Sequence, residues 1–273
     1  MQPLSNIHAL IIDMDGVLWK GSQALPGLTD FFQALRDLKI PFLLATNNAS
    51  LTQDQYIDKL ASMHVAVSPN EILTSSMATA CYLSEQVDPK SSRVFVIGED
   101  GLRQPLIEKG FTLIDCYQNN AESADFVICG LDRQLIWDKL VNASLHLSAG
   151  AKFIATNADT SLPTERGTIL GNGAILAALQ AATQIKPTII GKPEPIMYQQ
   201  AINMLGISPD KTVAIGDRLN TDILGAVNTG IRSLMVLTGI STEADLKTID
   251  YQPTWIMPDI QAVTKALLNN ITP

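Results

Sequence analysis

Two aspartates that directly follow an apolar stretch are the first chemically informative feature of this sequence. The segment Ile7–Asp13 is predicted to be a strand, and Asp15 and Gly16 come just after it. A continuous apolar run is typical of a strand buried on both faces. Carboxylates at the end of such a strand are costly unless positive charge lies near them. Other parts of the chain must therefore supply the partners of Asp13 and Asp15.

Three further predicted strands also change abruptly from apolar to polar residues at their ends. One ends in Thr46, Asn47 and Asn48, another is followed by Lys192, and a third by Asp217 and then Asp222. In an open parallel sheet, ligands bind in the crevice outside the carboxyl ends of the strands. Acidic, amide and ammonium groups are therefore expected to line one crevice.

The types of these residues indicate a reaction class. Converging carboxylates repel one another by about 4 kcal/mol per pair at about 4 Å and an effective dielectric constant near 20. A hard divalent cation removes that cost, and an all-oxygen ligand set without cysteine or histidine favours Mg²⁺. A magnesium site beside a lysine and amide or hydroxyl donors suits a phosphoryl group. One aspartate can then attack phosphorus while a second transfers protons.

Strands and helices alternate along the whole chain, which predicts parallel sheets with helices on both faces. The series is interrupted near Val87–Ser92 and again at Gln184–Pro187, which suggests an inserted second module. A long loop containing Pro163 and Gly167 is expected before a helix that ends near Thr183. The segment Leu237–Gly239 ends a strand and suits either an ordinary turn or the lining of the crevice.

Composition excludes several classes of protein. The chain has 273 residues, 46% of them hydrophobic, with a formal net charge of −8. Nucleic acid is not expected as a partner of so acidic a chain. The three cysteines lack metal-ligand spacing, so neither a disulfide framework nor a thiolate zinc site is expected, and reduced thiols suit a cytoplasmic protein. No signal peptide or membrane span is expected, so a membrane is not a predicted partner.

Taken together and in order, these segments resemble the four motifs of the haloacid dehalogenase superfamily. Finer features are similar to its class IIA, NagD-type branch, which includes 4-nitrophenylphosphatases, phosphoglycolate phosphatases and pyridoxal phosphate phosphatases. The resemblance covers nearly the whole chain. The segments that carry it are Asp13-Met14-Asp15-Gly16, Leu25-Pro26-Gly27, Thr46-Asn47-Asn48-Ala49-Ser50, Ala155-Thr156-Asn157-Ala158-Asp159, Ile190-Gly191-Lys192-Pro193 and Gly216-Asp217-Arg218-Leu219-Asn220-Thr221-Asp222.

The resemblance implies an α/β fold: a doubly wound, Rossmann-like catalytic core of residues 1–87 and 188–273, with a smaller α/β cap at 88–187 that selects the substrate. It implies a phosphatase of small phosphate monoesters, of the sugar phosphate, phosphoglycolate or nucleotide type. The partner is thus a small phosphorylated metabolite, and a homodimer formed through the cap agrees with similar proteins.

The same resemblance implies a role for each candidate residue. Asp13 is the nucleophile and Asp15 the general acid and base. Mg²⁺ is bound by the carboxylates of Asp13 and Asp217 and by the backbone carbonyl of Asp15. Asp222 supports the metal site without binding the ion directly. The phosphoryl oxygens are held by Thr46, Asn47, Asn48 and Lys192.

Each motif, taken by itself, also has an interpretation that involves no catalytic or binding function. Asp13 and Asp15 could belong to a turn, and Asp222 could lie on a helix surface. A phosphotransferase or phosphomutase would use the same aspartyl-phosphate, and a non-enzymatic phospholigand-binding protein could share the fold. Leu162 occupies the position at which pyridoxal-phosphate-type relatives carry a histidine, which disfavours that substrate.

Overall fold

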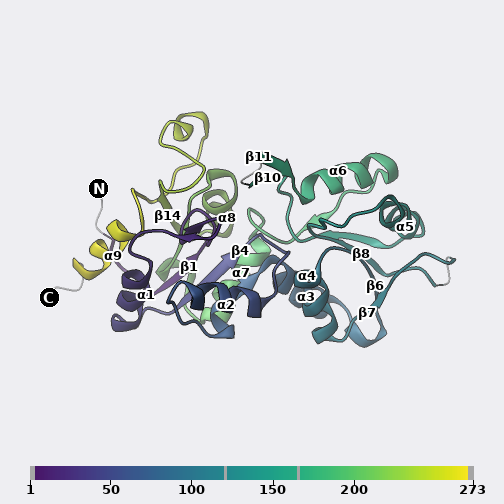
Figure 1. The fold of residues 1–273 in the computed structure, drawn as a ribbon, viewed down its shortest axis with the longest axis horizontal. Helices are drawn as coiled ribbons and strands as arrows, with labels where there is room; N and C mark the ends of the chain where they lie inside the picture. Colours follow the sequence, from purple (N-terminus) through teal and green to yellow (C-terminus); the bar gives the residue numbers. More distant parts are fainter. Residues whose placement is uncertain (1–3, 120–121, 165–166, 270–273) are drawn as a thin grey trace. The chain divides into compact units, whose positions relative to one another are not determined.

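The computed structural model describes residues 4–119, 122–164 and 167–269. The chain forms two compact units (Figure 1). The first unit comprises residues 1–46, 54–73 and 192–273, and the second comprises residues 47–53 and 74–191. Each unit contains its own sheet.

The sheet of the first unit has six strands in the order β15-β14-β13-β1-β4-β5. Four of its neighbouring pairs, from β15 to β4, are parallel. Every residue of β1, β4 and β13 is buried, as expected for strands covered on both faces. The strands span Ala9–Ile12 (β1), Phe42–Thr46 (β4), Ile72–Thr74 (β5), Thr212–Gly216 (β13), Arg232–Val236 (β14) and Trp255–Met257 (β15).

The strand order reverses between β1 and β13. From β1 the chain adds β4 and β5 on one side, and it later adds β13, β14 and β15 on the other. Such a switch point opens a crevice at the carboxyl ends of the two central strands. The residues that directly follow β1 and β13 are therefore placed to form a site.

Helices cover this sheet. Helix α7 contacts β1 and β4, α8 contacts β14, and α1 packs against α9. A short hairpin of β2 and β3 follows β1. The remaining elements of this unit are β2 (Trp19–Lys20), β3 (Gln23–Ala24), α1 (Leu28–Asp37), α2 (Gln53–Ser62), α7 (Pro195–Leu205), a π-helical turn (Leu219–Ile223), α8 (Leu224–Thr229), α9 (Ile260–Asn269) and three 3₁₀ turns (Pro69–Glu71, Pro209–Lys211, Asp245–Thr248).

The second unit has a five-stranded parallel sheet in the order β12-β9-β8-β6-β7. An antiparallel hairpin of β10 and β11 precedes α6. Its elements are α3 (Ser75–Gln86), a 3₁₀ turn (Pro89–Ser91), β6 (Arg93–Ile97), α4 (Asp100–Lys109), β7 (Thr112–Ile114), β8 (Phe126–Cys129), α5 (Trp137–Ser148), β9 (Lys152–Ala155), β10 (Ser161–Thr164), β11 (Gly167–Leu170), α6 (Asn172–Thr183) and β12 (Thr188–Ile189).

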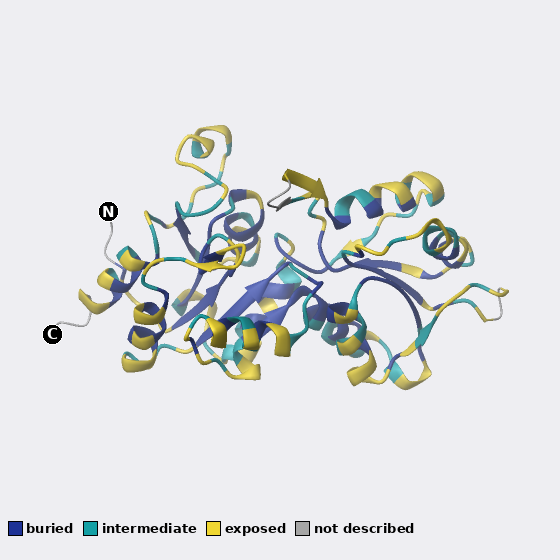
Figure 2. Ribbon diagram, viewed as in Figure 1, coloured by how far each residue is buried: buried dark blue, intermediate teal, exposed yellow. Residues whose placement is uncertain are grey.

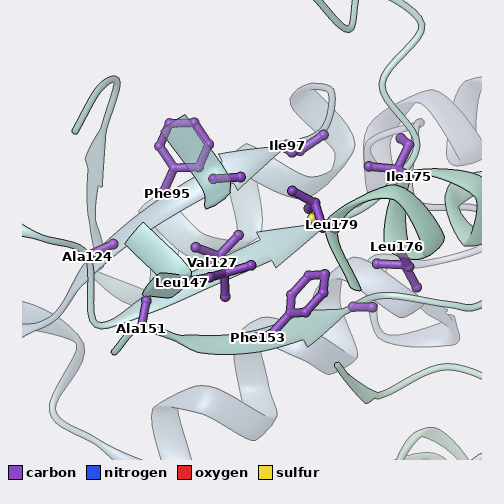
Figure 3. Close-up of a cluster of buried hydrophobic side chains, with 13 residues drawn as sticks. Phe95, Ile97, Ala124, Val127, Leu147, Ala151, Phe153, Ile175, Leu176 and Leu179 are labelled. Carbon is purple, nitrogen blue, oxygen red and sulfur yellow. The ribbon is translucent and has the colours of Figure 1, made fainter. Parts of the chain in front are cut away.

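The core of this unit lies between its sheet and the helices α5 and α6. Phe95, Val127 and Phe153 project from neighbouring strands onto Leu147 of α5 and Leu179 of α6 (Figure 3). In both units the central strands of the sheet are buried and the outer faces of the helices are exposed (Figure 2). The second unit is therefore stabilised by an apolar core of its own.

The α/β fold with parallel sheets and flanking helices is confirmed. The predicted long loop before α6 instead contains the β10–β11 hairpin, and β2, β3 and β7 were not expected. These strands have two to four residues, too few for alternation to distinguish them from loop.

Helix α3 packs against α4, so it groups with the second unit, whereas the predicted core extended to residue 87. The assignment of one module as catalytic core and the other as cap remains a prediction. Within the described residues, none of the helices is both long and apolar enough to span a membrane.

Candidate functional site

The ends of β1 and β13 bring two of the predicted acidic residues together. Ile12 pairs with Ile215 in register, and the backbone N–H of Asp13 donates to the Ile215 carbonyl at 2.8 Å. Asp13 follows β1 and Asp217 follows β13, so parallel pairing places both at the same edge of the sheet. The switch point therefore positions the cluster.

Asp222 completes this cluster. One carboxylate oxygen from each of Asp13, Asp217 and Asp222 lies within 4.8 Å of the others. Asp217 and Asp222 are each 1% exposed. The helix-surface interpretation of Asp222 is therefore wrong, because a π-helical turn between β13 and α8 directs its side chain inward. Such turns are frequent at functional sites.

Lys192 supplies the positive charge that the cluster requires. Its Nζ lies 2.6 Å from Oδ1 of Asp13 and 2.6 Å from Oδ1 of Asp222, and it donates to the Ala45 carbonyl at 2.9 Å. Lys192 is 3% exposed, so these are buried ion pairs. One ammonium faces three carboxylates, and the pocket keeps an excess of negative charge.

Burial, and then this excess of negative charge, shift the pKa values of the acids. Burial raises the pKa of Asp13 well above its ordinary range, Asp222 and Asp217 raise it further, and Lys192 opposes them. Burial, followed by the charge of Asp222, raises the pKa of Asp217 to about 7. Burial disfavours the charged form of Lys192, but Asp13 and Asp222 outweigh it and raise its pKa.

The cluster fits a hard divalent cation. Oδ2 of Asp217 accepts a hydrogen bond from the backbone N–H of Ile240 at 2.7 Å, whereas its buried Oδ1 has no hydrogen-bond partner among the described residues. A buried carboxylate oxygen without a partner is costly, and coordination to a cation removes that cost. The ligands are all oxygens, as Mg²⁺ prefers. Asp13 and Asp217 would hold the ion, and it would polarise a bound phosphoryl group.

The turn after β1 separates Asp15 from this buried cluster. Gly16 has a φ of +88°, and a Cβ there would lie 2.6 Å from Oδ2 of Asp217. Only glycine tolerates both the backbone angle and the close approach. The Asp15 side chain is exposed, and its Oδ1 accepts a hydrogen bond from Nε1 of Trp19 at 2.7 Å.

The three predicted phosphate-binding residues at the end of β4 are divided between the two units. Thr46 ends β4, is buried and belongs to the first unit. Asn47 and Asn48 belong to the second unit. Their predicted contact with phosphoryl oxygens stays a prediction.

Within the second unit, the two asparagines are held by their own neighbours. The Asn47 carbonyl accepts from Ser75 Oγ at 2.7 Å and from Asn157 Nδ2 at 2.8 Å. Oδ1 of Asn48 accepts from the backbone N–H and the hydroxyl of Ser50 at 3.0 and 2.7 Å, which forms a local turn.

The loop after β14 contains supporting residues that sequence reasoning did not assign. Thr238 Oγ1 donates to the Gly16 carbonyl at 2.6 Å, and Ile240 donates its backbone N–H to Asp217. A Cβ on Gly239 would lie 1.7 Å from Oδ2 of Asp217. The apolar-to-polar change at Leu237–Gly239 was the available signal. Of its two interpretations, the structure favours the crevice lining.

Comparisons with known proteins show the family to which this chain belongs. The profile of the haloacid dehalogenase-like hydrolases matches residues 10–112, and a second profile of HAD-like hydrolases matches residues 189–263. The acid sugar phosphatase of Staphylococcus epidermidis is 38% identical over 264 residues, which cover 97% of this chain and 99% of that protein.

Solved structures are similar over the same extent. A double mutant of the thermostable NPPase from Geobacillus stearothermophilus is 40% identical, with a TM-score of 0.85 over 93% of this chain and 97% of that one. The 4-nitrophenylphosphatase of Thermotoga maritima is 32% identical, with a TM-score of 0.88 over 96% of this chain and 98% of that one. The chain therefore belongs to the haloacid dehalogenase-like hydrolases, in the class IIA branch of 4-nitrophenylphosphatase-like proteins.

Proposed function

We propose that this protein is a Mg²⁺-dependent phosphatase that hydrolyses small phosphate monoesters through an aspartyl-phosphate intermediate. The observation that carries the proposal is the buried cluster of Asp13, Asp217 and Asp222 around Lys192. Relatives named as phosphatases support the reaction class. Among the substrates expected from the sequence, the acid sugar phosphatases favour a sugar phosphate, so the expected partner is a small phosphorylated metabolite.

The contacts of Asp13 suit it to attack phosphorus. Lys192 binds Oδ1, so Oδ2 is available to form the bond to phosphorus while the ester P–O bond breaks. The ammonium opposes the rise in the pKa of Asp13 that burial causes, and so favours its ionised, nucleophilic form. Asp15 donates a proton to the departing oxygen. It then takes a proton from the water that hydrolyses the aspartyl-phosphate and releases Asp13.

The proposal is tested with Asp13→Asn and p-nitrophenyl phosphate. We expect Mg²⁺-dependent hydrolysis in the unmodified protein, its abolition in the Asp13 variant, and unchanged activity in Asp30→Asn, which alters an exposed aspartate of α1. Retained turnover in Asp13→Asn would refute the nucleophile assignment. Binding of phosphate esters without turnover by the unmodified protein would favour a phospholigand-binding protein.

A second assay separates hydrolysis from transfer. Products are analysed after incubation with a sugar phosphate, with and without an acceptor sugar. Release of inorganic phosphate in both cases supports a phosphatase, and phosphorylation of the acceptor would favour a phosphotransferase or phosphomutase.

The homodimer through residues 88–187 is a separate proposal, which light scattering of the purified protein tests.

A further inference from the structure

The position of the Asp15 side chain depends on a single neighbour. Asp15 is exposed, and in the described part of the chain its carboxylate has one hydrogen-bond donor, the indole Nε1 of Trp19 at 2.7 Å. An exposed carboxylate without a fixed partner moves among several rotamers. The indole hydrogen bond therefore restricts a side chain that would otherwise be mobile.

Trp19 is itself rigidly held. It is fully buried and begins the hairpin, with Trp19 of β2 paired to Ala24 of β3. Its carbonyl accepts from the backbone N–H of Gly16 at 2.8 Å, and the Met14 carbonyl accepts from Leu18 at 2.8 Å. These bonds close a tight turn, so the indole and the carboxylate face each other across it.

A cation lies on the face of the same indole. Nζ of Lys59, on α2, lies 4.1 Å from the centroid of the Trp19 ring. Lys59 is partly buried, and none of the ion pairs of the described residues includes it. A cation over an aromatic face is attracted by the ring, with the largest effect for tryptophan. The ammonium also interacts electrostatically with Asp15.

We propose that Trp19, with Lys59 stacked on it, is a positioning residue that holds Asp15 for proton transfer to the leaving group. The inference rests on the proposed function. As the bond from Asp13 to phosphorus forms and the ester P–O bond breaks, the proton moves from Asp15 to the departing oxygen. Trp19 occupies Oδ1, so Oδ2 carries the proton.

The consequence is measurable because esters differ in how much they need an acid. p-Nitrophenolate is a good leaving group and departs with little protonation, whereas the alkoxide of glycerol 3-phosphate needs a proton. We expect Trp19→Phe to lower kcat/KM for glycerol 3-phosphate by about ten-fold or more, and that for p-nitrophenyl phosphate by less than about three-fold. Trp137→Phe, at an exposed tryptophan in the second unit, is the matched control and should change neither.

Lys59 is tested by removing and then restoring its charge. Lys59→Met keeps the aliphatic stem and should reproduce part of the ester-selective loss. Lys59→Arg keeps a cation over the ring and should restore activity toward glycerol 3-phosphate.

Equal losses of kcat/KM on both esters in Trp19→Phe would show that Trp19 has a merely structural role, and would overturn the inference.

A double-mutant cycle with Asp15→Asn gives a second readout, on variants whose folding is first checked by circular dichroism. If Trp19 acts through Asp15, Trp19→Phe should lower kcat/KM for glycerol 3-phosphate much less in the Asp15→Asn background than in the unmodified protein. Additive losses would contradict the inference. Failure of the proposed function would be distinguishable, because the unmodified protein would then hydrolyse neither ester.

Discussion

Nζ of Lys192 lies 2.6 Å from Oδ1 of Asp222, and both side chains are almost completely buried. Asp222 was expected to support a metal ion, and the structure shows that it also binds the lysine that contacts Asp13. Because one ammonium bridges two carboxylates, Asp222 fixes the position of Lys192 while Lys192 fixes Asp13. Removal of any of the three should disturb the other two.

Lys192→Met should therefore be both inactive and unstable. The substitution leaves Asp13 and Asp222 buried without their shared cation, and breaking a buried pair in this way costs about 3–5 kcal/mol. Chemical denaturation at neutral pH measures the loss in the free energy of unfolding. Lys265→Met, at an exposed position on α9, should cost less than about 0.5 kcal/mol. A similar small loss in Lys192→Met would contradict the bridging role.

Asp217 should make the metal-free protein less stable as pH rises. Its pKa is about 7 in the folded protein, above the ordinary value of 3.8. Between pH 3.8 and about pH 7, Asp217 holds a proton in the folded chain that it has lost in the unfolded chain. The free energy of unfolding therefore falls as pH rises through this range. We expect a lower Tm at pH 8 than at pH 5 in EDTA.

Added Mg²⁺ should reverse this effect, because the cation compensates the ionised carboxylates. The rise in Tm on adding Mg²⁺ should be larger at pH 8 than at pH 5, and absent in Asp217→Asn. Metal removal should abolish hydrolysis of p-nitrophenyl phosphate, and Mg²⁺ should restore it. Activity that persists in excess EDTA would argue against the metal-binding role.

Gly239→Ala should weaken metal binding without removing any ligand. The added Cβ would overlap with the carboxylate of Asp217, so either the loop or the carboxylate must move. Disturbing groups that orient a metal ligand typically costs 10- to 100-fold in affinity. Calorimetric titration with Mg²⁺ measures the change. Ile240→Ala keeps the backbone N–H that binds Asp217 and should retain the affinity.

His146 should make the second unit sensitive to acid. It is fully buried, and its Nδ1 accepts the backbone N–H of Ala124 at 3.1 Å. Burial, with a contribution from Arg93, lowers the pKa of His146 below its ordinary value of 6.5. The unfolded chain then binds the proton more readily, so stability is lost as pH falls below about 6.5.

Hydrogen exchange of the β8 peptide at pH 5 and pH 7 measures this effect locally. Protection should be lower at pH 5 in the unmodified protein. In His146→Phe protection should be lower at both pH values, because the Ala124 N–H loses its acceptor, but the difference between them should shrink. His8→Gln alters an exposed histidine and should keep the difference. If the difference in protection between pH 5 and pH 7 is unchanged in His146→Phe, His146 is not the group that makes this unit sensitive to acid.

The sequence by itself determined much of this fold and of the acidic site. Strands buried on both faces carry an uninterrupted apolar signal, so β1, β4 and β13 and the polar residues after them were recognised. The ends of parallel strands meet at one edge of a sheet, and this rule was enough to bring Asp13 and Asp217 together. Lys192 instead follows β12, a strand of the other sheet, so the same rule does not explain its contact with Asp13.

Only the tertiary structure decided how those residues are connected. Asp222 is inward because of a π-helical turn, and Asp217 is held by Ile240 through a backbone N–H that carries no side-chain signature. Trp19 lies opposite Asp15 because a tight turn and a two-residue strand place it there. Such contacts depend on backbone geometry over a few residues, which neither apolar periodicity nor motif spacing encodes.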